Sequence, residues 1–339
     1  MTQQAAVTQA ARGAVAVCTT ALIGLTLEGC GSGTESHSSN APNLTTVRYA
    51  FTDPNSPYTP DMVIQANPGM CHQFGVDPSI TILKTPAASP ALSAGQIDML
   101  NSGGGAAIQA AFKQPGSAKI VARTDSVALV LYGTKDIKTV QNLKGKTVGA
   151  SSSGSLADLV FLTFLPKEGL TLGTDVHTTY TGTATALIGL ATAGAIQGFI
   201  QNPPLPDAAV AAGVHEIKKL SGDPDIDPLG ATALSANAKF LSKNRAAAKG
   251  MLDCYAQAQK QVLASPEAAA PIFAKAASLN EQVALAQIKA TSDAFKLLPY
   301  GKQDAATVIK AQEAGGVQQY GNFDPSALID NLVDASSSG

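Results

Sequence analysis

The chain contains no tryptophan, and aromatic residues make up only 5% of its 339 residues. Because aromatic side chains provide the stacking surfaces that bind single-stranded nucleic acid, such surfaces are not expected. Charged residues are scarce at 14%, and 23 basic residues stand against 25 acidic ones for a net charge of -2. Lysine and arginine form no cluster, so we expect no nucleic-acid partner.

The residue patterns of common catalytic and metal sites are also missing. The four histidines lack the spacing of metal ligands, and no serine lies in a Gly-x-Ser-x-Gly turn. The glycine-rich segment 101–105 does not continue into the Gly-Lys-Ser/Thr of a phosphate-binding loop. Asp223, Asp225 and Asp227 alternate, but the glycine and glutamate of a calcium-binding loop are absent. We therefore expect no catalytic residue, no metal and no cofactor.

No apolar run is long enough to span a bilayer, which takes about 20 residues. An uncharged run of 14 residues, Ala14 to Leu27, follows Arg12 and is typical of a secretory signal. It ends in Leu27-Glu28-Gly29-Cys30, which resembles the bacterial lipobox, although Glu28 is atypical there. We expect a signal peptide over residues 1–29, a lipid on Cys30 and a polar tether over 30–43. The protein would then be exported and anchored at the outer face of the bacterial cytoplasmic membrane; an unlipidated signal peptide is the alternative.

Only two cysteines, Cys71 and Cys254, lie beyond this N-terminal region. In an oxidising compartment, two cysteines favour a disulfide. Two buried free thiols are an equally good interpretation of the sequence.

From Val47 onward, short β-prone runs alternate with helical segments. Strands are predicted at 47–51, 80–83, 97–100, 120–122, 127–132, 147–150, 176–180, 195–200 and 231–235. Alternation of this kind predicts an α/β fold with parallel-rich sheets and helices on both faces. Residues 237–335 are alanine-rich and predicted to be helical, without further strands. We expect two lobes, the first from residues 44–127 and 235–339 and the second from 128–234.

Three segments carry a family resemblance. Leu92-Ser93-Ala94-Gly95-Gln96-Ile97-Asp98 is similar to an "L-x-x-G-x-I-D" motif, and Leu143-Lys144-Gly145-Lys146-Thr147-Val148-Gly149 to an "L-K-G-K-x-V-G/A" motif. A third motif is matched in part at 191–198, where Gln197-Gly198 replaces Asp-Ala, a change expected to alter the pocket. These motifs resemble those of ABC-transporter substrate-binding proteins of the nitrate, sulfonate, taurine and thiamine-precursor group. The resemblance implies a type II periplasmic-binding-protein fold whose two lobes close on a ligand.

The resemblance also implies a function. We expect the substrate-binding component of an ABC importer, a monomer that presents a small organic anion or zwitterion to a permease and its ATPase. Sulfonate, taurine and nitrate are the expected kinds of ligand. A thiamine-type pyrimidine, an enzyme on the same scaffold and a signalling lipoprotein remain alternatives. Fungal pyrimidine synthases of this fold carry Cys-Cys-Cys-Phe-Cys, which is absent here.

Ligands of open parallel sheets bind beyond the carboxyl ends of the strands. This rule selects Phe51, Asp53, Ser56, Tyr58, Ser102, Gly103, Gly104, Ser152, Ser153, Gly154, Ser155, Gln201 and Asn202. The serine-rich turn 151–155 is the sharpest candidate, because hydroxyl and amide groups at the positive end of a helix suit an oxyanion. Simple N-capping is its alternative. Phe51 and Tyr58 fit the hydrophobic core as well as the wall of a pocket.

Overall fold

The computed structural model describes residues 43–334, except for 53 and 182–184 and the side chains at 56, 85, 86, 185 and 293. The predicted signal peptide, Cys30 and nearly all of the tether therefore lie outside the described residues. Within the described part, no helix is long and apolar enough to cross a membrane. The described residues belong to one compact unit.

The first of two sheets has six strands in the order β11-β4-β10-β3-β1-β2. Its strands are β1 (Thr45–Thr52), β2 (Val76–Leu83), β3 (Met99–Gly103), β4 (Ala118–Thr124), β10 (Thr232–Asn237) and β11 (Leu297–Leu298). β1 is parallel to β2 and β3, whereas β10 is antiparallel to both β3 and β4. β1, β3 and β4 therefore run in the same direction and end at the same edge of the sheet.

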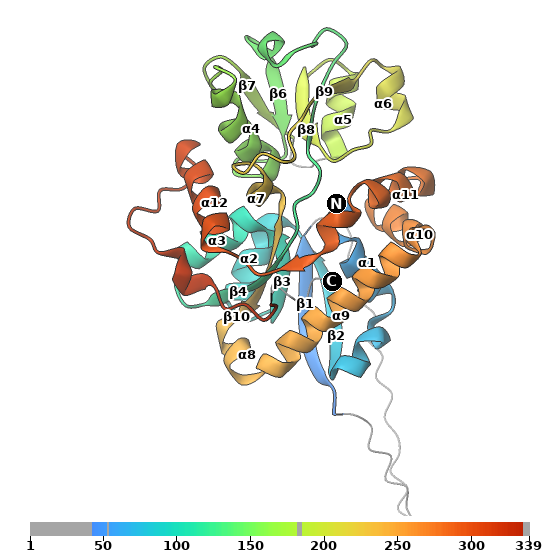
Figure 1. The fold of residues 1–339 in the computed structure, drawn as a ribbon, viewed down its shortest axis with the longest axis vertical. Coiled ribbons are helices and arrows are strands. Elements are labelled where there is room, and N and C mark those ends of the chain that lie inside the picture. The colour runs from blue at the N-terminus through green and yellow to red at the C-terminus, as the bar shows by residue number, and fades with distance from the viewer. Residues whose placement is uncertain (1–42, 53, 182–184, 335–339) are drawn as a thin grey trace, which may run out of the picture. The chain divides into compact units, whose positions relative to one another are not determined.

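The second sheet has five strands in the order β7-β6-β8-β5-β9 (Figure 1). Its strands are β5 (Val130–Gly133), β6 (Thr147–Ala150), β7 (His177–Tyr180), β8 (Gly198–Gln201) and β9 (His215–Lys219). β6 is parallel to β7 and β8, so their carboxyl ends also share one edge. The chain passes from the first sheet to the second between β4 and β5 and returns between β9 and β10.

Twelve α-helices lie in the described part of the chain. Their bounds are α1 (Thr59–Ala66), α2 (Thr85–Ser93), α3 (Gly104–Lys113), α4 (Leu156–Lys167), α5 (Thr185–Thr192), α6 (Asp207–Ala211), α7 (Asp227–Gly230), α8 (Ala238–Lys243), α9 (Arg245–Ala264), α10 (Pro266–Ala277), α11 (Glu281–Ala290) and α12 (Lys302–Ala314). Two 3-10 helices, η1 (Ser56–Tyr58) and η2 (Pro68–Phe74), flank α1.

Alternating side chains place apolar residues on both faces of each sheet, as buried parallel strands require. In β1, Tyr49 packs with helices α1 and α9, whereas Ala50 packs on the opposite face with α2. In the second sheet, Val148 of β6 lies in a cluster with α4, and Phe199 of β8 lies in one with α5 and α6. The cluster around α4 also includes Ile108 of α3, so one hydrophobic core runs from the first sheet's helices to the second's.

The first and third sequence motifs form the same structure in the two sheets. The Asp98 carboxylate accepts the backbone N–H of Arg48 at 2.9 Å, and the Asp98 N–H donates to the Arg48 carbonyl at 2.7 Å. Gln197 repeats this exchange with Thr147, at 3.1 Å through its side-chain oxygen and 2.7 Å through its N–H. Gln197 thus does the structural work that Asp98 does.

Several predictions of the strands are wrong. β3 continues through Gly103, so Asn101 and Ser102 lie in a strand and not in a loop. Strands do not stop at Asn237, because Leu297–Leu298 adds a short edge strand, β11, that pairs with β4. The strand His215–Lys219 is absent from the predicted set, since its alternation of charged and apolar residues is brief.

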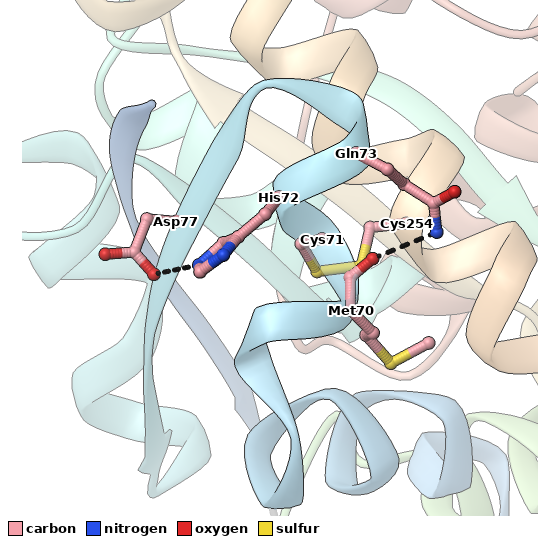
Figure 2. The surroundings of a disulfide bond; sticks show 6 residues. All are labelled: Met70, Cys71, His72, Gln73, Asp77 and Cys254. Carbon is pink, nitrogen blue, oxygen red and sulfur yellow. Dashed lines mark hydrogen bonds and ion pairs between the residues drawn. A yellow bond between two sulfur atoms is a disulfide. The ribbon is translucent and has the colours of Figure 1, made fainter. Parts of the chain in front are cut away.

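Cys71 of η2 and Cys254 of α9 form a disulfide that joins positions 183 residues apart (Figure 2). Both residues are fully buried in the core of the first sheet's α1–α9 face. Near this bond, His72 pairs with Asp77 at 3.1 Å, which ties η2 to the start of β2. Of the two interpretations of the cysteines, the structure contains the disulfide.

Candidate ligand-binding site

Polar residues follow the parallel strands of both sheets, at the edges where those strands end. In the first sheet, β1 leads through η1 into α1, and β3 leads directly into α3. In the second sheet, β6 leads into α4 and β7 into α5. Each edge therefore brings together helix N-termini, whose free N–H groups and positive dipole ends attract polar ligands.

The serine-rich turn 151–155 connects β6 to α4. Gly154 has a φ of +73°, a left-handed conformation that favours glycine. Ser155 is the N-cap residue, but its side chain does not bond to a helix N–H; its hydroxyl instead accepts a weak bond from the Ser152 N–H at 3.4 Å. The side chains of Ser152 and Ser153 are exposed. Simple N-capping by serine is therefore not what this turn does.

Asp158 caps this turn in place of a serine. Its carboxylate accepts the Gly154 N–H at 2.8 Å and the Tyr180 hydroxyl at 3.1 Å, and the residue is only 1% exposed. Burial raises the pKa of Asp158, while the two hydrogen bonds act in the opposite direction. A carboxylate thus already occupies the positive end of α4, which makes the turn a poorer oxyanion site than the sequence suggests.

Tyr180, the last residue of β7, provides an aromatic face beside the turn. It pairs with Ala150 across the β6–β7 ladder and is 51% exposed. Its hydroxyl bonds to Asp158 and also to the side chain of Ser153. Burial and the nearby Asp158 charge raise the pKa of Tyr180, so the hydroxyl stays a donor. An exposed ring whose hydroxyl bonds to a carboxylate suits an ammonium group, because cations are attracted to the faces of aromatic rings.

Basic side chains are missing from the segments that follow these strands. Residues 49–83, 85–112, 147–166 and 168–217 contain no lysine or arginine. Arg123, near the end of β4, pairs with Asp304 at 3.2 Å and lies 3.9 Å from Asp125. Two carboxylates therefore offset this guanidinium. At the ends of β1, β3, β6 and β7, hydroxyl and amide groups would therefore hold an anionic part of a ligand, while Lys84 after β2 and Lys219 at the end of β9 are exposed lysines at the same two edges.

The predicted residues after β1 pack largely inside the protein. Phe51 is fully buried and Tyr58 is 4% exposed, with their ring centroids 5.7 Å apart. Both residues therefore lie in the hydrophobic core, which was the alternative to the wall of a pocket. The Tyr58 hydroxyl lies 3.0 Å from the Thr52 hydroxyl. Asp53 and the side chain of Ser56 lie outside the described residues.

The glycines at the start of α3 differ in their surroundings. A Cβ on Gly103 would meet nothing within 4 Å, so backbone there is open to a ligand. A Cβ on Gly104 would lie 3.5 Å from the Tyr300 hydroxyl, and one on Gly105 would lie 3.2 Å from Leu159 of α4. Gly105 is therefore a contact between α3 and α4. Ser102 is fully buried in β3.

The remaining predicted residues follow β8. Gln201 is the last residue of this strand, and both Gln201 and Asn202 are partly exposed. They share the carboxyl edge of β6 and β8 with the serine-rich turn. No group of histidine, cysteine, aspartate and glutamate that could hold a metal occurs within residues 43–334 as described.

A second polar group lies in the core of the first sheet and was not predicted. Asp61 in the first turn of α1 is fully buried and bonded to Tyr49 and Asn101. Burial raises the pKa of Asp61 to about 7. The sequence signal available for Asp61 was only an acidic residue near a helix start, which is common at exposed helix ends.

The two sheets, their strand orders and the polar strand ends define the periplasmic-binding-protein fold. The chain matches the model of the NMT1-like family over residues 85–278, which is more than half of its length, and it belongs to that family. No match was found among curated proteins.

Solved structures share this fold across nearly the whole chain. The periplasmic aliphatic sulphonate-binding protein SsuA from Escherichia coli superposes with a TM-score of 0.68 at 20% identity, covering 85% of this chain and 94% of its own. The periplasmic nitrate-binding protein NrtA from Synechocystis gives 0.65 at 17% identity, over 86% and 87% of the two chains. The alkanesulfonate-binding protein SsuA from Xanthomonas axonopodis, bound to MOPS, gives 0.61 at 17% identity, over 86% and 97%.

Proposed function

We propose that this chain is the extracytoplasmic substrate-binding component of an ABC importer. The observation that carries the proposal is the pair of polar strand edges, one on each sheet of a single unit, which supply helix N-termini, hydroxyls and an open glycine. The fold shared with sulphonate- and nitrate-binding proteins supports it. The lobes would be residues 44–127 with 235–339 and residues 128–234, with the ligand held between them.

The ligand we propose is a small zwitterion, of the kind of taurine, rather than a plain anion. Tyr180 and the charge of the buried Asp158 favour an ammonium group at the second sheet's edge, and the exposed hydroxyl of Ser152 can donate to a sulfonate or carboxylate. Lysine and arginine are absent from the segments that directly follow β1, β3, β6, β7 and β8, which supports this choice. A plain anion would meet the Asp158 charge without a compensating cation.

A thermal-shift screen tests the ligand class. The panel contains taurine, ethanesulfonate, nitrate, bicarbonate and a thiamine-type pyrimidine. A ligand at 100 times its Kd stabilises the native state by about 2.7 kcal/mol, or about 4 °C in Tm for a chain of this size. We expect taurine or a related zwitterion to raise Tm and ethanesulfonate to raise it less. A shift with the plain anions alone would refute the zwitterion, and no shift with any compound would count against the receptor.

We also propose export, lipid attachment at Cys30 and action as a monomer beside a permease and its ATPase. The apolar run before Leu27-Glu28-Gly29-Cys30 supports the first two points. Incorporation of labelled palmitate in a bacterial host tests them directly. Wild-type protein should carry the label in the membrane fraction, and Cys30→Ala should lose it. Equal labelling of both proteins would place the lipid elsewhere.

A further inference from the structure

Four buried polar side chains from four different elements meet in the core of the first sheet. They are Tyr49 of β1, Asp61 of α1, Asn101 of β3 and Tyr255 of α9, and none is more than 1% exposed. The Tyr49 hydroxyl donates to the Asp61 carboxyl group. The Asn101 amide nitrogen lies 3.3 and 3.1 Å from the two Asp61 oxygens.

Two oxygens of this buried cluster have no hydrogen-bond partner among the described residues: the Asn101 side-chain oxygen and the Tyr255 hydroxyl. Buried polar atoms normally have partners, so such an oxygen indicates an unassigned proton or an alternative rotamer. The two ends of an asparagine amide have the same shape, and turning the amide over exchanges its donor and acceptor. A protonated Asp61 could then donate to the Asn101 oxygen, which would gain the partner that it lacks.

The surroundings of Asp61 favour the protonated form. Burial raises its pKa to about 7, against the lowering effect of the bonds from Tyr49 and Asn101. Besides burial, the negative charge of Asp61 raises the pKa of Tyr255 in α9, and Tyr58 of η1 raises the pKa of both Tyr49 and Tyr255.

No cation faces the Asp61 carboxyl group in the described part. The titratable groups of η2 and α10, which also pack against α1, are exposed at the surface: His72, Glu267 and Lys275. The disulfide at Cys254 fixes the position of the neighbouring Tyr255. The cluster thus lacks a countercharge, so an added proton is the simplest way to neutralise it.

We propose that Asp61 is a positioning residue for the end of β3, where a proton on its carboxyl group sets the orientation of the Asn101 amide. Loss of the proton turns the amide over and changes the hydrogen bonding at the start of the segment Asn101–Gly104. The importance of this for a ligand rests on the proposed function, because the end of β3 matters only if it is a binding edge. The proton itself does not depend on any ligand.

Amide NMR of the ligand-free, full-length protein between pH 5 and pH 9 tests the inference. We expect the backbone signals of Asn101 to Gly104 to titrate with a midpoint near that of the Asp61 carboxyl carbon. In Asp61→Asn, which keeps a donor and an acceptor at this position, these signals should not titrate. If the Asp61 carboxyl carbon titrates as an exposed aspartate does, or if the signals of Asn101 to Gly104 do not change with it, the inference is overturned.

Tyr49→Phe is the second variant, and it tests the proposal independently if Asp61→Asn does not fold. Removing the Tyr49 hydroxyl takes away a bond that lowers the pKa of Asp61, so the titration midpoint of the Asn101 to Gly104 signals should move to higher pH. A merely structural hydrogen bond would leave the midpoint in place, and that result overturns the proposal. Because no ligand is added, failure of the ligand screen and failure of this titration are separate outcomes.

Discussion

Reduction of the Cys71–Cys254 disulfide should lower the free energy of unfolding substantially. The bond joins positions 183 residues apart, so it restricts more than half of the chain in the unfolded state. The chain-entropy model gives a loss of about 5 kcal/mol for a loop of this length. With an unfolding entropy of about 0.6 kcal/mol/K for a unit of this size, Tm should fall by about 8 °C.

Urea denaturation and calorimetry of the oxidised and reduced wild-type protein measure this effect. Reduced wild type keeps both sulfur atoms, so the comparison isolates the cross-link from the packing of the fully buried Cys71 and Cys254. The variant Cys71→Ala/Cys254→Ala should be less stable still, because it also loses buried volume. It should not respond to reductant, which controls for Cys18 and Cys30. Equal stability of oxidised and reduced wild type would refute the reasoning.

Three further predictions concern single residues. The pKa of the Asp61 carboxyl group is raised from 3.8 to about 7 in the folded state. The protonated carboxyl group therefore contributes fully to the free energy of unfolding below about pH 4, and this contribution is lost as pH rises through 7. The change amounts to up to about 4 kcal/mol. Asp61→Asn should flatten this part of the stability–pH curve measured by urea denaturation, and an unchanged curve would contradict the assignment. Asp158→Asn removes the charge at the start of α4, and calorimetry should show the preference for taurine over ethanesulfonate reduced by about fivefold, or about 1 kcal/mol; an unchanged ratio would exclude Asp158 from selectivity. Gly250→Ala places a Cβ 2.4 Å from the Phe74 carbonyl oxygen, so it should lower the free energy of unfolding by about 1–3 kcal/mol, as measured by thermal unfolding. In the matched control, Gly189→Ala in α5, the added Cβ meets no atom within 4 Å, and the free energy of unfolding should rise by about 0.5–1 kcal/mol.

The alternation of strands and helices could be predicted because local signals agree there with the fold. β6 occurs at its predicted residues, 147–150, since the Ser/Gly turn 151–155 marks its end. β3 runs beyond its predicted end because Asn101 pairs with both β1 and β10, and Ser102 pairs with β10. Pairing within a buried sheet overrides the weak strand propensity of these residues.

The candidate site was predictable only in its loops. The rule for strand ends selects the serine-rich turn, but it does not show that Asp158 caps it. The buried Asp61 bonds to Tyr49, 12 residues away in the sequence, and the buried Asp158 bonds to Tyr180, 22 residues away. Side chains so far apart meet only through tertiary packing, so a single sequence without a matching motif does not reveal their charge or protonation.

Calorimetry of ligand binding to Ser152→Ala/Ser153→Ala/Ser155→Ala tests the central claim most directly. The titrant is the compound with the largest thermal shift in the screen, and Ser242→Ala/Ser265→Ala, at exposed serines outside the site, is the matched control. The account predicts that the triple variant binds at least about tenfold more weakly, or about 1.4 kcal/mol, with an unchanged Tm. Equal affinity of the triple variant, the control and the wild type would contradict it.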